Sequence, residues 1–136
     1  MWHSSCHKAG IPGDKELYIH LKSNRDFQKV YNNGKSLANK YLVMYVLKND
    51  LNENRFGISV SKKVGNSVVR HRITRLIRES YRLNCNLFES GYDIVVIARI
   101  TAKGKSYKDI CSALIHLGKI HNIVSEWYEE YFIRCY

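Results

Sequence analysis

The stretch from residue 55 to residue 82, RFGISVSKKVGNSVVRHRITRLIRESYR, constrains the fold more than any other part of the chain. In its first part, Phe56, Ile58 and Val60 alternate mostly with small or polar residues, which predicts a half-buried strand. After a lysine-rich turn, Asn66 is a suitable N-cap, and the apolar residues then recur at helical spacing. The stretch therefore predicts a strand, a turn and an amphipathic helix that runs to about residue 84.

The outer face of this helix is almost entirely basic. A step of about 100° per residue puts Val69, Ile73 and Ile77 on one side and most arginines on the other. An ordinary solvated face mixes charges of both signs, whereas Glu79 is the only acid between residues 70 and 82. Because like charges repel, we interpret this face as a phosphate-binding surface. Its arginines are Arg70, Arg72, Arg75, Arg78 and Arg82.

The charge of the whole chain favours the same kind of partner. Its 136 residues contain 22 Lys and Arg against 12 Asp and Glu, a net charge of +10. Such a balance favours a polyanion, with nucleic acid first and an anionic membrane surface second. No apolar run approaches the roughly 18 residues that a membrane span needs, and the N-terminus lacks the pattern of a signal peptide. We therefore expect one soluble domain in the cytoplasm.

Two capping patterns predict two further helices. Ser23 and Ser106 are each followed three residues later by Asp, a spacing that resembles the capping box. The first pattern predicts a short helix at residues 24–33, which Gly34 would end in the left-handed conformation. The second predicts a helix that runs to about residue 120.

Two more segments have the composition of strands. Residues 40–48 form a β-rich run, and the polar residues 49–54 connect it to the strand that begins at Arg55, so we expect these two strands to pair as a hairpin. Residues 91–98 form a turn and a nearly continuous apolar run, which is typical of a central strand covered on both faces.

The alternation of residues predicts a shallow trough on one face of the hairpin. If the even-numbered, fully apolar residues of the run 40–48 face the core, then Tyr41 and Tyr45 lie on the opposite face. Ser59 shares that face from the next strand, and Lys63 continues the same parity beyond it. Aromatic rings, a hydroxyl and a cation therefore line one surface.

No sequence pattern typical of catalysis by protein groups is present. The chain lacks the G-x-S-x-G, H-E-x-x-H and P-loop motifs, and no two carboxylates on one element have a spacing that suggests a general acid and base. A self-sufficient metallonuclease would need a cluster of carboxylates, and we interpret Asp93 as a turn residue. We therefore predict no catalytic residue and no protein-bound metal ion.

The segment SVSKKVGNSVVRHRITRLIRESYR resembles the signature of the bacterial ribonuclease P protein subunit, an arginine-rich helix after a K-x-G-N turn. Upstream, LKSNRDFQKVYNNGKSLANKYLVMYVL resembles the opening helix and first strands of that family, and GYDIVVIAR resembles its last strand. The resemblance covers about residues 21–121. One departure is His71, which stands between Arg70 and Arg72 where the family typically has asparagine.

This resemblance implies an α+β fold: a single-domain sandwich in the order αβββαβα, with a mostly antiparallel central sheet and a left-handed βαβ crossover. Residues 21–121 would form this RNA-binding domain. Residues 1–20 would be a disordered lead or an added segment. Residues 122–136 would form a tail, for which a further helix and a frayed end both stay open.

The resemblance also implies a function. Ribonuclease P is an endoribonuclease that removes the 5′ leader of precursor tRNA, and its catalytic groups and Mg²⁺ sites belong to a large RNA. The protein, monomeric when free, would bind that RNA and the leader as an accessory subunit. A non-catalytic RNA-binding module of ribosomal or RNA-chaperone type is the alternative.

Position in the family motif implies two sets of site residues. The leader would lie in a cleft between the first helix and the sheet, lined by Phe27, Tyr31, Tyr45, Ser59 and Lys63. The partner RNA would contact the turn and the arginine helix through Lys62, Arg70, His71, Arg72, Arg75, Arg78 and Arg82.

Overall fold

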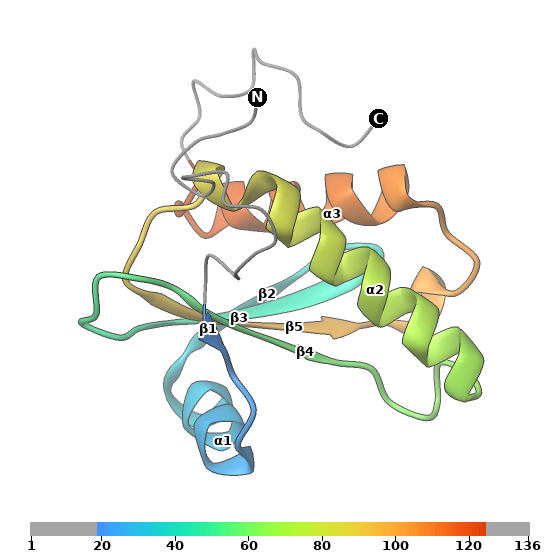
Figure 1. Ribbon diagram of the computed structural model, residues 1–136, viewed down its shortest axis with the longest axis horizontal. Helices are drawn as coiled ribbons and strands as arrows, with labels where there is room; N and C mark the ends of the chain where they lie inside the picture. The colour runs from blue at the N-terminus through green and yellow to red at the C-terminus, as the bar shows by residue number, and fades with distance from the viewer. Residues whose placement is uncertain (1–18, 125–136) are drawn as a thin grey trace.

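A five-stranded sheet separates one helix from two others in the computed structural model, which describes residues 19–124 (Figure 1). Helix α1 lies against one face of the sheet, and helices α2 and α3 cover the other. Two short 3₁₀ helices, Cys85–Leu87 and Ile100–Ala102, lie on either side of β5. The main elements are β1 (Ile19–His20), α1 (Asn24–Asn33), β2 (Lys35–Ala38), β3 (Leu42–Lys48), β4 (Arg55–Ser59), α2 (Ser67–Asn84), β5 (Tyr92–Ala98) and α3 (Tyr107–Ile120).

The strands are arranged in the order β1–β4–β5–β3–β2. The pairs β2–β3 and β3–β5 are antiparallel, and the pairs β1–β4 and β4–β5 are parallel. The chain leaves β4, crosses one face as α2 and returns as β5. Figure 1 shows β4 in front of β5 with α2 above both, which makes the crossover left-handed. The αβββαβα order implied by the resemblance is confirmed, with the two-residue strand β1 ahead of α1.

The predicted hairpin between residues 40–48 and the strand that begins at Arg55 is wrong. β3 and β4 are consecutive in the chain, but β5 lies between them. Ile94, Val95 and Val96 of β5 are fully buried. A strand that is apolar on both faces needs cover on both faces, which a central position supplies. The polar connection at residues 49–54 therefore joins two strands that are not paired.

The helix boundaries agree closely with the sequence patterns. The Ser23 hydroxyl accepts a hydrogen bond from the backbone N–H of Asp26 (3.1 Å), and the Asn66 side chain accepts one from that of Val69 (3.0 Å). A full capping box starts α3 at Ser106. Gly34 differs from the prediction because its φ is −87°. Glycine is instead required there by close packing, since a Cβ would lie 2.7 Å from a backbone oxygen.

The two faces of the sheet are buried to different extents. The main core lies between the sheet and helices α2 and α3, and in it the rings of Phe56 and Tyr81 stack with centroids 4.0 Å apart. Leu42, Met44 and Val46 of β3 face this core, as the alternation predicted. A smaller cluster under α1 centres on Leu21, Val30 and Val95. Helix α1 is the only helix in the described part of the chain on that face, so part of the face stays accessible.

None of the helices formed by residues 19–124 is both long enough and apolar enough to cross a membrane.

Candidate nucleic-acid interface

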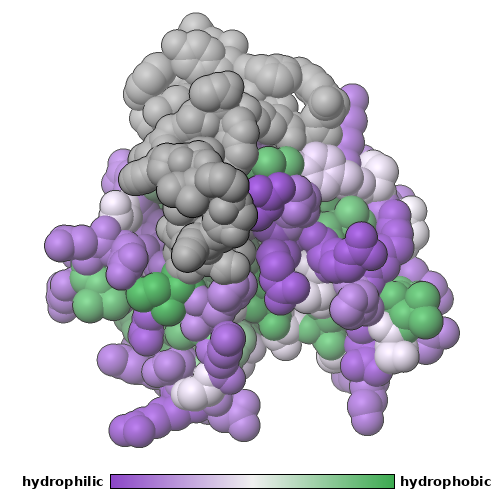
Figure 2. Space-filling view, in the orientation of Figure 1, coloured by the Kyte–Doolittle hydropathy of each residue, from purple (hydrophilic) through white to green (hydrophobic). Residues whose placement is uncertain are grey.

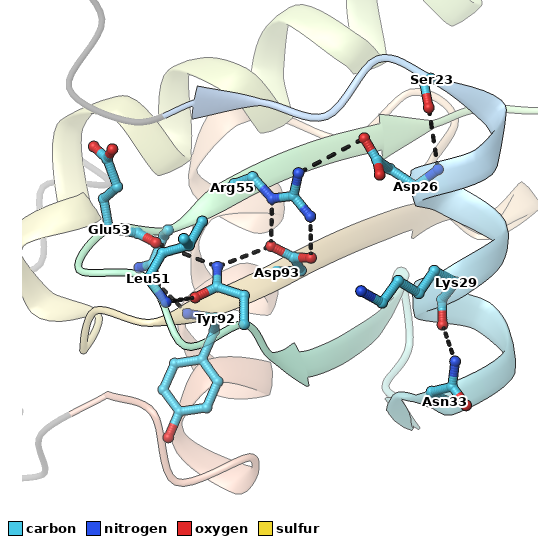
Figure 3. Close-up of polar contacts among 11 residues, drawn as sticks. Ser23, Asp26, Lys29, Asn33, Leu51, Glu53, Arg55, Tyr92 and Asp93 are labelled. Carbon is cyan, nitrogen blue, oxygen red and sulfur yellow. Dashed lines mark hydrogen bonds and ion pairs between the residues drawn. The ribbon is translucent and has the colours of Figure 1, made fainter.

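A polar network attaches α1 to the sheet (Figure 3). Arg55 of β4 forms a double hydrogen bond with Asp93 of β5, with distances of 2.8 Å from Nε to Oδ1 and 2.6 Å from Nη2 to Oδ2. The third nitrogen of the same guanidinium, Nη1, lies 3.7 Å from the Asp26 carboxylate on α1. The Asn49 amide also donates to Asp93, at 2.9 Å. The network therefore fixes the first turn of α1 above the ends of β4 and β5.

Asp93 is a buried charge and not the turn residue that we predicted. Its side chain is only 2% exposed, whereas that of Arg55 is 24% exposed. Burial raises the pKa of Asp93, but the hydrogen bonds from Arg55 and Asn49 outweigh this effect and hold the pKa below its usual value. The same pair raises the pKa of Arg55. Both groups are therefore charged at neutral pH.

Three predicted site residues meet beside α1. The rings of Phe27 and Tyr31 have centroids 6.2 Å apart, and those of Tyr31 and Tyr45 are 5.0 Å apart in an edge-to-face arrangement. All three side chains are half-buried. Phe27 lies over Gly57 of β4, where a Cβ would be only 2.6 Å from the ring. The small residue on the strand therefore makes room for the aromatic ring.

Ser59 continues this surface along β4. It lies two residues beyond Gly57, on the same face of the sheet, and pairs in register with Ile97 of β5. Ile97 and Tyr45 both pack against the smaller cluster under α1. We call the surface formed by Phe27, Tyr31, Tyr45 and Ser59 the aromatic cleft, after the leader cleft that the family resemblance implies.

Lys63 and Tyr41 were both predicted to lie on the same face as Tyr45, and the structure places them differently. Lys63 lies in the turn after β4, is exposed, and lines a hollow of about 270 Å³ with Arg99 and Thr101. It therefore lies past the carboxyl end of β4, beyond Ser59. Tyr41 has the parity of Tyr45 but precedes β3 and packs against the main core. It is therefore not part of the aromatic cleft.

A second candidate surface lies on the outer side of α2. His71, Arg72, Arg75 and Arg78 are exposed there and line an open groove of about 870 Å³. The α2 side of the molecule is largely hydrophilic, with separate hydrophobic patches (Figure 2). The remaining lining residues are Ser67, Val68, Leu76 and Glu79 of α2 and Tyr107 of α3. We call this surface the arginine groove.

The structure does not place all the predicted arginines in this groove. Arg70 is half-buried, and its Nε donates to the Gly65 carbonyl at 3.2 Å, so it braces the turn before α2. Arg82 forms an ion pair with Glu79, with 3.2 Å between Nε and Oε1. Lys62 is exposed in the turn. The groove itself therefore has three arginines.

Two important residues were missed from the sequence, one in the arginine groove and one in the network that attaches α1. Tyr107 lines the arginine groove from α3, and no local pattern could have shown that it meets α2. Asp93, in contrast, is an acid inside an apolar strand, and a buried acid needs a partner. That signal was available in the sequence. Within residues 19–124, no three His, Cys, Asp or Glu side chains are grouped so that they could hold a metal ion.

Comparisons with known proteins agree on one family. The family model described as Ribonuclease P matches residues 18–121. The ribonuclease P protein component of Lachnoclostridium phytofermentans is 68% identical over 105 residues, which cover 77% of this chain and 90% of that protein. That of Clostridioides difficile is 54% identical over 100 residues, covering 73% of this chain and 88% of that protein.

Solved structures show the same fold. The Staphylococcus aureus ribonuclease P protein at 2.0 Å has a TM-score of 0.72 and 40% identity, over 78% of this chain and 97% of that chain. The ribonuclease P protein from Thermotoga maritima has a TM-score of 0.69 and 33% identity, over 74% of this chain and 96% of that chain.

Proposed function

The chain belongs to the ribonuclease P protein family, and from this membership we propose that it is the protein subunit of a ribonucleoprotein that removes the 5′ leader of precursor tRNA. In this proposal the catalytic groups belong to a partner RNA. The observation that carries it is the presence of two surfaces of different chemistry on opposite sides of one sheet, the aromatic cleft and the arginine groove. A protein with two such surfaces can hold two RNA segments at once.

The arginine groove suits the folded partner RNA. Guanidinium groups bind phosphates through two parallel hydrogen bonds, and a folded RNA brings phosphates close together. Arg72, Arg75 and Arg78 are exposed within seven residues of one helix. On the other side of that helix, Ile73 and Ile77 are fully buried in the core. The groove therefore lies on a helix whose opposite side is anchored in the main core.

The aromatic cleft suits the single-stranded leader. Single strands are bound by stacking of bases on aromatic rings and by cations that follow the backbone. Phe27, Tyr31 and Tyr45 supply the rings, and Lys63 stands beyond Ser59 to meet a phosphate. Stacking depends little on base identity, which fits a subunit that must accept leaders of many sequences.

Mg²⁺ belongs to the partner RNA in this proposal. The protein would lower the Mg²⁺ requirement because its cations neutralise phosphates that otherwise need metal ions. The net charge of +10 supports such a role.

The proposal is tested by reconstitution. The protein is mixed with a bacterial ribonuclease P RNA, and cleavage of precursor tRNA is measured at low Mg²⁺ concentration, where the RNA alone is slow. We expect the protein to raise the cleavage rate and the affinity for substrate. Tight RNA binding without any effect on cleavage would instead favour a ribosomal or chaperone module. Cleavage by the protein without RNA would contradict the assignment of catalysis to the RNA.

A further inference from the structure

The arginine groove is lined partly by apolar side chains, and phosphate binding does not explain them. Val68, in the first turn of α2, is 75% exposed, the largest exposure among the large hydrophobic residues exposed in the described part of the chain. Leu76 and Tyr107 are half-buried and line the same groove. Exposing such a surface to water is unfavourable. A partner that covers it would remove that cost.

Glu79 in the groove also indicates that phosphates do not occupy the whole length of the groove. Glu79 lines the groove and is half-exposed, with its carboxylate paired to Arg82. A carboxylate repels phosphate but accepts hydrogen bonds from amino groups, such as those on cytosine or adenine. The groove therefore has arginines that suit a phosphate and, beside Tyr107, surroundings that suit a base.

Tyr107 is held in position before any partner binds. It is the first residue of α3, directly after the capping box at Ser106. Its hydroxyl is hydrogen-bonded to the Ser80 side chain, and burial together with the Glu79 charge raises its pKa. A ring that is already ordered loses little conformational entropy when a base stacks on it.

We propose that the groove between α2 and α3 binds one unpaired nucleobase of the partner RNA, with the ring of Tyr107 as its stacking surface. Arg72, Arg75 and Arg78 bind the phosphates on either side of that nucleotide. The open volume of about 870 Å³ is large enough to admit a base. This inference rests on the proposed function, because it takes the RNA bound at this groove to be the ribonuclease P RNA.

The test compares three substitutions at one position. Tyr107→Phe keeps the ring, Tyr107→Leu keeps apolar volume without a ring, and Tyr107→Ala removes both. Affinity for a bacterial ribonuclease P RNA is measured as a function of salt concentration. Stacking on an aromatic ring predicts binding about 5-fold to 100-fold weaker for the Leu and Ala variants and nearly unchanged for Phe. The salt dependence stays the same, because no charge is removed.

A footprint of the RNA identifies the base. Dimethyl sulfate modifies accessible unpaired adenines and cytosines, and we expect one such base to be protected by the wild type and by Tyr107→Phe but to react in the Leu complex. Thermal unfolding of all variants is recorded in parallel, so that a loss of binding can be distinguished from a loss of folding. Wild-type binding by the Leu and Ala variants would overturn the inference while leaving the proposed function intact. Failure of the wild type to bind the RNA would overturn both.

Discussion

The aromatic cleft and the arginine groove differ in what supports them. The groove is the outer side of α2, whose inner side, with Ile73 and Ile77, forms the main core. The cleft lies on the face of the sheet where α1 is the only helix formed by residues 19–124, and the network of Arg55 and Asp93 attaches that helix. The exposed arginines of the groove can therefore be replaced with little effect on folding. Cleft side chains pack against the smaller cluster under α1, and in the proposed function they also bind the leader, so we expect their substitution to affect stability as well as binding.

The largest effect is expected from removing the groove arginines together. The variant with Arg72→Ala, Arg75→Ala and Arg78→Ala should bind ribonuclease P RNA roughly 100-fold to 1000-fold more weakly at 0.1 M salt, because three guanidinium groups no longer bind phosphates. The slope of log affinity against log salt should fall by about one for each arginine that is removed. Thermal unfolding should change little, since all three side chains are exposed.

A matched variant removes the same charge elsewhere. Lys22, Arg25 and Lys48 are exposed and lie outside α2, so replacing all three with alanine tests whether total charge alone matters. An equal loss of affinity in both triple variants would contradict the separate role of the groove.

The second-largest effect is expected on stability, from breaking the Arg55–Asp93 ion pair that attaches α1 beside the cleft. Asp93→Asn should lower the free energy of unfolding at pH 7 by about 2–4 kcal/mol, less than for a fully buried pair because Arg55 is partly exposed. The folded-state pKa of Asp93 is lowered, so its stabilisation is present above the unfolded value of about 3.9 and is lost as pH falls through the folded value. Denaturant unfolding at pH 7 and at acid pH measures both effects.

The control is Asp50→Asn, at an exposed site whose φ of 63° asparagine tolerates. It should leave stability nearly unchanged. If Asp93→Asn kept the full acid sensitivity of the wild type in that pH range, the stabilising role of the ion pair would be wrong.

The sequence predicts features that depend on residues close together in the chain better than features that depend on residues far apart. The ends of α1, α2 and α3 follow from Ser23, Asn66 and Ser106, because a cap bonds to residues three positions away. The inward faces of β3 and β4 follow from alternation. The insertion of β5 between these strands could not be predicted from the residues of β3 and β4 alone, because its pairing with them depends on contacts between residues 38 or more positions apart.

The same distinction applies to the candidate site. Phe27 and Tyr31 share an edge of α1 by helical spacing, but their contact with Tyr45 was implied only by the family resemblance. The different roles of Arg70 and Arg82 within one charged stripe depend on Gly65 and Glu79, which only the folded structure places. Sequence periodicity therefore identified the basic face but not which arginines are available to a partner.

A third prediction compares two glycines, one beneath the aromatic cleft and one at the start of α2, the helix that carries the arginine groove. Gly57→Ala would place a Cβ 2.6 Å from the ring of Phe27, and Gly65→Ala would place one 2.8 Å from Val69 at the start of α2. Each should cost about 1–3 kcal/mol of stability. Gly57→Ala should reduce leader binding more than RNA binding, and Gly65→Ala should do the reverse. Equal effects of both variants on both affinities would show that the two surfaces are not independent.

The smallest effect is expected at His71, which is exposed in the arginine groove. His71→Asn should change the affinity for ribonuclease P RNA by less than about 5-fold, because an amide can replace one hydrogen bond of the ring. His71→Ala should weaken binding more than His71→Asn does. Identical affinities for all three proteins would mean that this side chain does not touch the RNA.

The most direct test of two independent surfaces varies the length of the leader. We compare three reconstituted holoenzymes at saturating protein. They contain the wild type, the double variant Phe27→Ala and Tyr45→Ala, or the triple arginine variant. The affinity of each is measured for precursor tRNAs with long and with very short leaders. We predict that the cleft variant loses about 10-fold or more of the affinity for long leaders relative to short ones, since two stacking surfaces are removed. The arginine variant should lose none of this preference once assembled. An unchanged preference in the cleft variant would contradict the assignment of the leader to the aromatic cleft.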